Sequence, residues 1–173
     1  MRRTAMKTPA HITEIILRPG EFHFGDRRTR IRTTLGSCVS IVMWHQKLLI
    51  GGMCHYLLPN RSMSHRTTPD GRYADEAIEL FMREIRAAKT EISEYQVKIF
   101  GGGNMFPRHR RQGKYANVPS KNVIAARDIA KLYALNVIGV NLGGIGHRQI
   151  VFDVWSGDVW VRHVGIQNGD SSE

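Results

Sequence analysis

The sequence predicts a single layered α/β domain of the α+β type, with two main helices packed on a largely antiparallel, mixed β-sheet. Three observations predict it. A chain of 173 residues suits one domain with its own core, short β-favouring apolar runs recur along it, and two longer segments repeat apolar residues at helical spacing. We expect the domain to span 12–164, between a flexible basic N-terminus at 1–11 and a flexible tail at 165–173.

In the first half of the chain we expect three strands and one helix. The strands are predicted at 12–17, 39–44 and 48–54, the last two joined by a turn at 45–47, and all three can pair as a meander. The helix is predicted from residues that share one face and pack against the sheet: Ala74, Ala77, Ile78, Phe81, Met82 and Ile85.

In the second half we expect a short buried strand at 97–100, a second helix and three more strands. Ser120 is the candidate N-cap of that helix. The residues expected to share its face are Val123, Ala126, Ala130 and Tyr133. The last strands are predicted at 137–141, 149–155 and 159–164, with a hairpin turn at 156–158.

The net charge of +10, from 25 Lys and Arg against 15 Asp and Glu, first raises nucleic-acid binding. Neither basic cluster has the interleaved aromatic residues of a base-stacking platform, and no helix-turn-helix or zinc-finger pattern occurs. We therefore predict no specific nucleic-acid partner. The two clusters are Arg27, Arg28, Arg30 and Arg32, and then Arg108, Arg110, Arg111 and Lys114.

The chain has only two cysteines and no Cys/His cluster with zinc-finger spacing, so no metal or cofactor is implied. The basic start at 1–7 is followed by no apolar segment of a secretory signal, and no apolar run is long enough to span a bilayer. We expect no membrane insertion and a reduced, cytoplasmic compartment, in which a catalytic thiol survives.

Cys38 and His55 are the candidate nucleophile and base, and they flank one short hairpin. An imidazole activates a thiol by taking its proton, which leaves a thiolate–imidazolium pair. Gly36 and Ser37 suit a tight turn whose backbone N–H groups could form an oxyanion hole. The alternative is a small buried Cys38 and a hydrogen-bonded core His55, and from these two residues alone that alternative is favoured.

Strand geometry decides which cysteine His55 could activate. Successive side chains of a strand point to opposite faces, so Cys54 and His55 should point apart. Cys38 can approach the imidazole from across the hairpin. We therefore expect Cys38 to be the acidic, reactive thiol and Cys54 to be buried and slow to react.

Cys38 lies in the pattern Thr-x-Leu-Gly-Ser-Cys-Val, and His55 lies in Gly-Gly-Met-x-His-x-x-Leu-Pro. These segments resemble the CheD family of chemoreceptor glutamine deamidases, and the resemblance covers about residues 12–164. Pro119 departs from the family, which usually has a glycine there. Further residues that match the family are the segment 97–105, Asn122, Gly143, Gly144, Gly146 and Arg148.

The resemblance implies that Cys38 attacks the side-chain amide of a receptor glutamine and that His55 serves as acid and base. It also implies that a threonine near the turn orients the imidazole; Thr33 is our choice and Thr34 the reserve. Asn104, with Gly36 and Ser37, could contribute oxyanion or substrate support.

The partners that the resemblance implies are chemoreceptor cytoplasmic domains, as substrate, and a CheC-type phosphatase. Receptor domains rich in glutamate would be attracted by a basic rim around the active site. Two alternatives stay open: a catalytically silent regulator that only binds such a phosphatase, and a basic nucleic-acid-binding protein.

Overall fold

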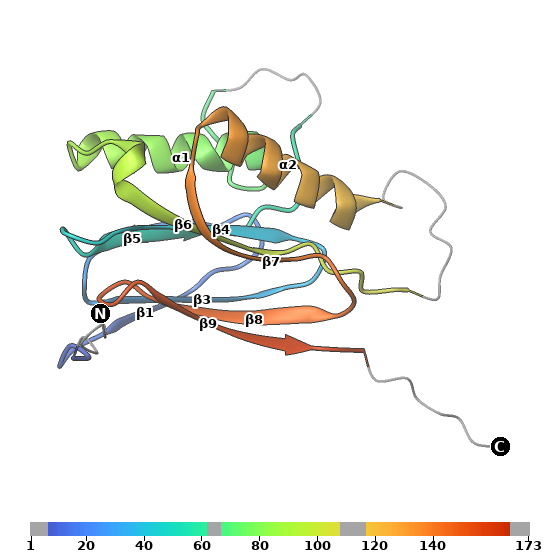
Figure 1. The fold of residues 1–173 in the computed structure, drawn as a ribbon, viewed down its shortest axis with the longest axis horizontal. Coiled ribbons are helices and arrows are strands. Elements are labelled where there is room, and N and C mark those ends of the chain that lie inside the picture. The colour runs from blue at the N-terminus through green and yellow to red at the C-terminus, as the bar shows by residue number, and fades with distance from the viewer. Residues whose placement is uncertain (1–6, 62–66, 108–116, 167–173) are drawn as a thin grey trace.

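A computed structural model describes residues 7–61, 67–107 and 117–166. Parts of the expected flexible ends, 1–6 and 167–173, and the whole second basic cluster lie outside the described residues. The described chain forms three layers, with both helices on one side of a five-stranded sheet and a four-stranded sheet on its other side (Figure 1). No helix among these residues is both long and apolar enough to cross a membrane.

The four-stranded sheet has the order β1-β3-β8-β9 and the five-stranded sheet the order β2-β5-β4-β6-β7. Pairing is antiparallel except for β1 with β3 and β6 with β7. In chain order the elements are β1 Thr13–Ile16, β2 Phe22–Gly25, β3 Thr29–Leu35, β4 Val39–His45, β5 Ile50–Cys54, α1 Ala74–Ala87, a short 3₁₀ helix Ile92–Glu94, β6 Tyr95–Gly101, α2 Val118–Leu132, β7 Asn136–Leu142, β8 His147–Asp153 and β9 Asp158–Val164.

The α+β class, both helices and the β4–β5 and β8–β9 hairpins are confirmed, but the predicted meander is wrong. The segment at 12–17 forms β1, which lies parallel to β3 in the other sheet. The strands β2 and β3 were not predicted. In β3, residues of the buried face alternate with Arg30, Arg32 and Thr34 of the outer face. We interpreted the arginines as a basic cluster and therefore did not predict a strand with a polar outer face.

The second helix begins earlier than expected. It starts at Val118 after Asn117, and Pro119 occupies the first turn, so the prediction of Ser120 as N-cap is wrong. Proline suits the first turn because its missing N–H would have no partner inside the helix. Asn122 of this helix is fully buried, and its side chain donates to the Ser37 and Leu57 carbonyls.

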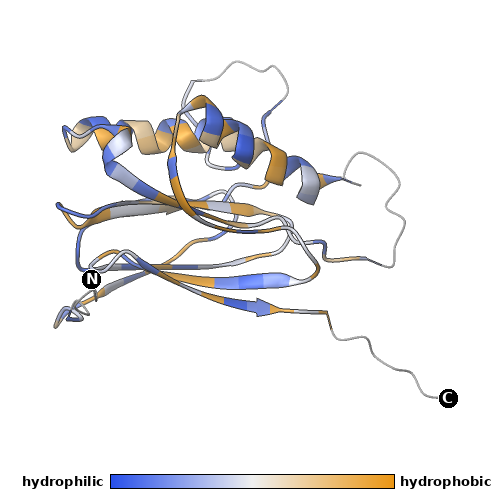
Figure 2. Ribbon diagram, in the orientation of Figure 1, coloured by the Kyte–Doolittle hydropathy of each residue, from blue (hydrophilic) through white to orange (hydrophobic). Residues whose placement is uncertain are grey.

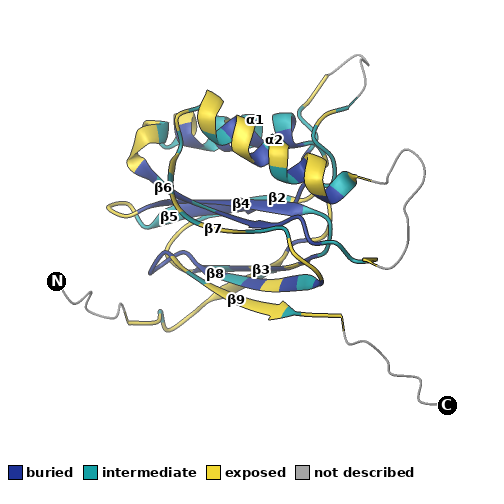
Figure 3. Ribbon diagram, turned by 45° about the vertical axis from the view of Figure 1, so that its right-hand side comes forward, coloured by how far each residue is buried: buried dark blue, intermediate teal, exposed yellow. Residues whose placement is uncertain are grey.

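Two hydrophobic cores hold the layers together. One lies between the helices and the five-stranded sheet and the other between the two sheets. The central strand β4 is buried along its whole length, whereas β9 and the outer sides of the helices are exposed (Figure 3). Hydropathy follows the same division, with apolar residues along the inner strands and polar ones on the outer helix surfaces (Figure 2).

Neighbouring strands of the four-stranded sheet offer a matched test of this layering. Ile31 of β3 is fully buried in the core between the sheets, whereas Ile16 of β1 is 64 % exposed. We expect Ile31→Ala to lower the free energy of unfolding by about 2–5 kcal/mol. Ile16→Ala should change it by less than about 0.5 kcal/mol. Urea denaturation of both variants measures the difference, and equal losses would contradict the stacked-sheet core.

Candidate active site

The cysteine turn, residues 36–38, connects β3 of one sheet to β4 of the other. The glycine-rich segment 101–103 packs so closely on it that a Cβ on Gly101 would stand 2.2 Å from the Cys38 carbonyl oxygen. A Cβ on Gly36 would stand 3.1 Å from the Met105 side chain. These glycines therefore allow two backbone segments to touch, which agrees with the prediction of a tight turn.

All three carbonyl groups of the cysteine turn accept hydrogen bonds. The donors are the Gly103 N–H to Gly36 at 2.8 Å, the Asn122 Nδ2 to Ser37 at 3.0 Å and the Gly102 N–H to Cys38 at 2.8 Å. Among the described residues, the N–H groups of Ser37 and Cys38 donate no hydrogen bond. They remain available as donors beside the thiol, as an oxyanion hole requires.

His55 follows β5 directly and is held on both sides by backbone hydrogen bonds. Its N–H donates to the Glu21 carbonyl at 3.1 Å, and its own carbonyl accepts from Gly20 at 2.7 Å. Val39 and Tyr56 exchange a reciprocal pair of bonds, so the register places Ser40 opposite His55. Cys38 shares the face of Ser40, and the thiol and imidazole therefore lie on the same side of the sheet as diagonal neighbours.

Thr33 reaches this site from the opposite sheet. Its hydroxyl oxygen lies 2.8 Å from His55 Nδ1 and 2.8 Å from the Leu17 carbonyl oxygen. A carbonyl can only accept, so the single hydroxyl proton goes to Leu17 and the hydroxyl accepts from Nδ1–H. This tautomer leaves Nε2 of the neutral imidazole with a free lone pair, which is the form that a general base needs.

Cys54 points to the opposite face of the five-stranded sheet from His55. Cys54 is fully buried in the helix-side core, where the Ile41 N–H donates to its sulfur at 3.4 Å. Burial raises the pKa of this thiol to about 12. The structure thus separates the two cysteines onto opposite faces of the five-stranded sheet, as the alternation argument predicted.

Burial keeps the candidate pair uncharged at rest. Partial burial raises the pKa of the Cys38 thiol, and a hydrogen bond from Ser37 offsets part of this effect. Burial also lowers the pKa of His55 to about 4. Both directions oppose the expected thiolate–imidazolium pair and the expected acidic Cys38. The structure favours a neutral thiol beside a neutral imidazole, with proton transfer during attack on the substrate.

Two residues were predicted in weaker roles: Thr34 points away from the site, and Asn104 lies in the loop beside the cysteine turn. Thr34 is exposed on the outer face of β3, pointing away from His55. Asn104 shapes the neighbouring loop, since its side-chain oxygen accepts from the Phe106 N–H at 3.0 Å and its own N–H donates to Gly144 at 2.8 Å. Thr33 is therefore the threonine at the site, and the contacts of Asn104 are those of a turn.

The first basic cluster does not form a rim around the thiol. Arg30 and Arg32 point outward from β3, on the face opposite Thr33. Arg30 binds Asp153 at 2.7 Å and Arg32 binds Glu14 at 3.1 Å. These ion pairs neutralise much of the cluster, so the structure gives no support to electrostatic steering by its arginines.

Two buried polar residues complete the surroundings of the turn. From the sequence, Asn122 could either contact the substrate or support the turn, and Arg148 was given no role. Asn122 donates from one amide nitrogen to Ser37 and to Leu57, at 3.0 and 2.7 Å. Arg148 donates to Asn141 at 2.5 Å and also to the Gly143 carbonyl, which braces the loop 143–146 near Gly103. The family resemblance had singled out both residues, but only the fold shows what they touch.

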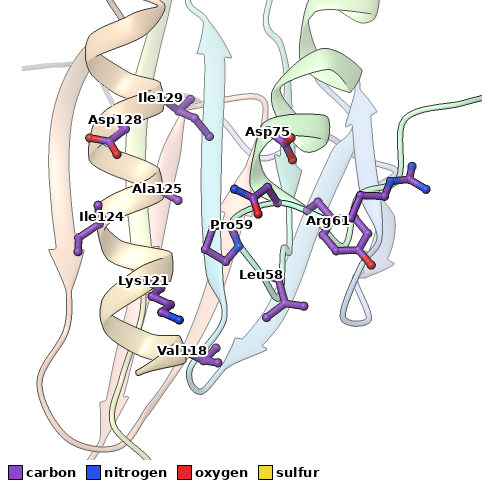
Figure 4. A pocket seen from close by; sticks show the side chains of 12 residues that line it. Leu58, Pro59, Arg61, Asp75, Val118, Lys121, Ile124, Ala125, Asp128 and Ile129 are labelled. Atoms are coloured by element: carbon purple, nitrogen blue, oxygen red, sulfur yellow. The ribbon is translucent and has the colours of Figure 1, made fainter. Parts of the chain in front are cut away.

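A groove of about 840 Å³ lies on the helix side, between α2 and the start of α1 (Figure 4). Leu58 and Pro59 lie between Lys121 of α2 and Asp75 of α1 in this view. Neither Cys38 nor His55 lines the groove. The candidate site, at the β3–β4 turn and just after β5, is therefore separate from this groove.

A thiol, an imidazole and a hydroxyl that fixes the imidazole tautomer make up the kind of site that cysteine hydrolases use. Comparison with known proteins shows the family. Residues 57–163 match the family described as CheD chemotactic sensory transduction.

The chain is 52 % identical to a probable chemoreceptor glutamine deamidase CheD of Pseudomonas savastanoi pv. phaseolicola, over 91 % of this chain and 89 % of that protein. It is 50 % identical to the protein of the same name in Pseudomonas fluorescens, over the same shares. A CheD 1 of Leptospira interrogans is 35 % identical over 89 % of this chain and 95 % of its own length. The chain belongs to the CheD family.

The two cysteines predict a selective labelling pattern. Iodoacetamide should modify Cys38, which is partly exposed, and leave Cys54 unmodified in the folded protein. Because the pKa of Cys38 is raised, its labelling rate should still increase steeply between about pH 7 and 9. Peptide mapping at several pH values measures both effects. A labelling rate that is already maximal near pH 6 would instead indicate a resting thiolate.

The buried neutral His55 predicts a loss of stability in acid. Its pKa is about 4 in the folded protein, against 6.5 in an unfolded chain, so between these values the unfolded state binds more protons. Stability should therefore fall as the pH drops from about 6.5 to 4, by roughly 3 kcal/mol from this group. His55→Gln should remove that part of the pH dependence, as urea denaturation of both proteins at pH 7 and 4.5 can show.

Proposed function

We propose that this protein deamidates glutamine side chains of chemoreceptors to glutamate, with Cys38 as nucleophile and His55 as general acid and base. One observation carries the proposal. The Thr33 hydroxyl, 2.8 Å from Nδ1, fixes His55 as a base whose free Nε2 lies on the face that also carries Cys38. The names of the curated relatives supply the substrate class.

The reaction starts with attack of the Cys38 sulfur on the glutamine amide carbon, while its proton passes to His55 Nε2. The amide oxygen becomes an oxyanion next to the unused N–H groups of the cysteine turn. His55 then gives the proton to the departing nitrogen, the C–N bond breaks, and ammonia leaves a thioester on Cys38.

Water completes the cycle. His55 removes a proton from the water that attacks the thioester carbon, the C–S bond breaks, and the thiol regains its proton. The net change is one glutamine and one water converted to one glutamate and one ammonia. Thr33 stabilises the imidazolium that forms in each half-reaction, although less than a carboxylate would, because a hydroxyl carries no charge.

We place this reaction in the cytoplasm, on the cytoplasmic domains of receptors, and propose a CheC-type phosphatase as a further partner. A catalytically silent regulator would not need the Thr33–His55 hydrogen bond, which fixes the tautomer of the imidazole. The nucleic-acid alternative loses support because Arg28, Arg30 and Arg32 are paired with carboxylates.

Removal of either member of the pair tests the mechanism. We expect Cys38→Ala to abolish ammonia release from a receptor cytoplasmic fragment, and His55→Ala to lower the rate by a factor on the order of 10² to 10⁴. Mass spectrometry should find the mass increase of about one dalton that accompanies conversion of an amide to an acid at named glutamines, with wild-type protein but not with Cys38→Ala. Cys54→Ala serves as the control and should remain active.

Two adjacent threonines provide a second test. Thr33→Val keeps the shape of the side chain but removes the hydroxyl that fixes the tautomer, so kcat should fall roughly ten- to a hundredfold. Thr34→Val makes the same chemical change on the exposed face of β3 and should leave kcat within about twofold. If both variants lose activity equally, the loss comes from β3 as a whole and the proposed role of Thr33 is wrong.

A further inference from the structure

We infer that Asn122 is a positioning residue, whose side-chain amide orients and polarises the Cys38 N–H as the principal donor of the oxyanion hole. This inference rests on the deamidase function proposed above and adds a residue to its machinery. Asn122 lies on α2 and is fully buried. It acts through the backbone of the turn, because its side-chain hydrogen bonds go to the Ser37 and Leu57 carbonyls.

The contacts of Asn122 define which way its amide faces. Its two partners, the carbonyl oxygens of Ser37 and Leu57, lie 3.0 and 2.7 Å from Nδ2. Both partners can only accept, so the nitrogen and not the oxygen must face them, and each of its two protons is used. One amide group thus binds the residue just before the nucleophile and the residue two positions after the base.

The bond to Ser37 controls the Cys38 N–H because the two groups belong to one peptide unit. In a planar trans peptide the C=O and the N–H point in opposite directions. A donor that fixes the Ser37 carbonyl toward α2 therefore fixes the Cys38 N–H away from α2. A hydrogen bond accepted by the carbonyl also polarises the peptide unit and strengthens its N–H as a donor.

The preceding peptide unit is held in the same manner. The Gly103 N–H donates to the Gly36 carbonyl at 2.8 Å, and this fixes the direction of the Ser37 N–H. In the next unit the Cys38 carbonyl is also held, but there the Val39 N–H is used, donating to Tyr56 at 3.1 Å. Two peptide units therefore combine a held carbonyl with an unused N–H: Gly36–Ser37 and Ser37–Cys38. Both lie beside the thiol.

The burial of Asn122 also indicates a role beyond packing. Its side-chain oxygen is buried and has no hydrogen-bond partner among the described residues. An unpaired buried oxygen is unfavourable, and an apolar side chain would fill the same space without that cost. The two bonds from the nitrogen explain why an amide occupies this position, since an apolar residue could not hold the Ser37 carbonyl.

The test compares a reaction that develops an oxyanion with one that does not. Deamidation passes through a tetrahedral oxyanion, whereas alkylation of Cys38 by iodoacetamide displaces iodide and forms none. We expect Asn122→Ala and Asn122→Asp to lower kcat for a receptor fragment roughly ten- to a hundredfold, with KM changed less than about threefold. The rate of Cys38 alkylation should stay within about threefold of wild type.

Asn122→Asp keeps the shape of the side chain and Asn122→Ala keeps it uncharged, so agreement between them attributes the loss to the missing donor. Tyr56→Phe is the matched control. It removes the hydroxyl that donates to the Asn122 backbone carbonyl at 2.6 Å but leaves the side-chain amide in place, and its kcat should remain within about threefold.

Three outcomes would overturn the inference. Asn122 variants with wild-type kcat would show that the amide does not assist the reaction. An equal loss of deamidation and of Cys38 alkylation would show general distortion of the site, as would an equal loss of kcat in Tyr56→Phe. A wild-type protein that releases no ammonia would instead overturn the deamidase function itself, and with it this role of Asn122.

Discussion

The Thr33 hydroxyl has one proton to give, and the candidate site depends on where that proton goes. The Leu17 carbonyl takes it, which obliges the oxygen to accept from His55 and sets the tautomer of the base. Thr33 lies in β3 of the four-stranded sheet, whereas His55 directly follows β5 of the five-stranded sheet. Their contact therefore exists only while the two sheets are stacked, and the apolar core between the sheets supports the His55 imidazole at the same time as it stabilises the fold.

The same burial that holds the site together keeps it uncharged. Removing the thiol and the imidazole from water disfavours the thiolate and the imidazolium, so the pair is uncharged before substrate binds. In the proposed reaction, charge develops only when the substrate carbonyl is present to receive it. That reaction needs fixed donors rather than a preformed ion pair, and the N–H groups of Ser37 and Cys38, whose peptide units are held through their carbonyls, are such donors without a charged residue.

Local patterns predicted the elements more reliably than they predicted the arrangement of those elements in space, and the catalytic roles of Cys38 and His55 stay a prediction. Helical spacing identified α1, and strand alternation correctly separated Cys54 from His55. The prediction of a meander was wrong because an apolar run does not show which sheet its strand joins. The parallel pairing of β1 with β3 cannot be inferred from the periodicity of either strand. The sequence could not choose between substrate contact and support of the turn for Asn122, because its side chain bonds to the Ser37 carbonyl, 85 residues away along the chain.

The separation of the two cysteines also determines how the protein responds to oxidation. Cys38 and Cys54 are the only thiols in the chain, and the five-stranded sheet stands between their side chains. A disulfide between them would require the sheet to open, because the bond needs side chains that point toward each other. If peroxide converts Cys38 to a sulfenic acid, the chain itself has no resolving cysteine to offer, and recovery of the nucleophile must come from an external thiol such as glutathione or a thioredoxin-type reductant.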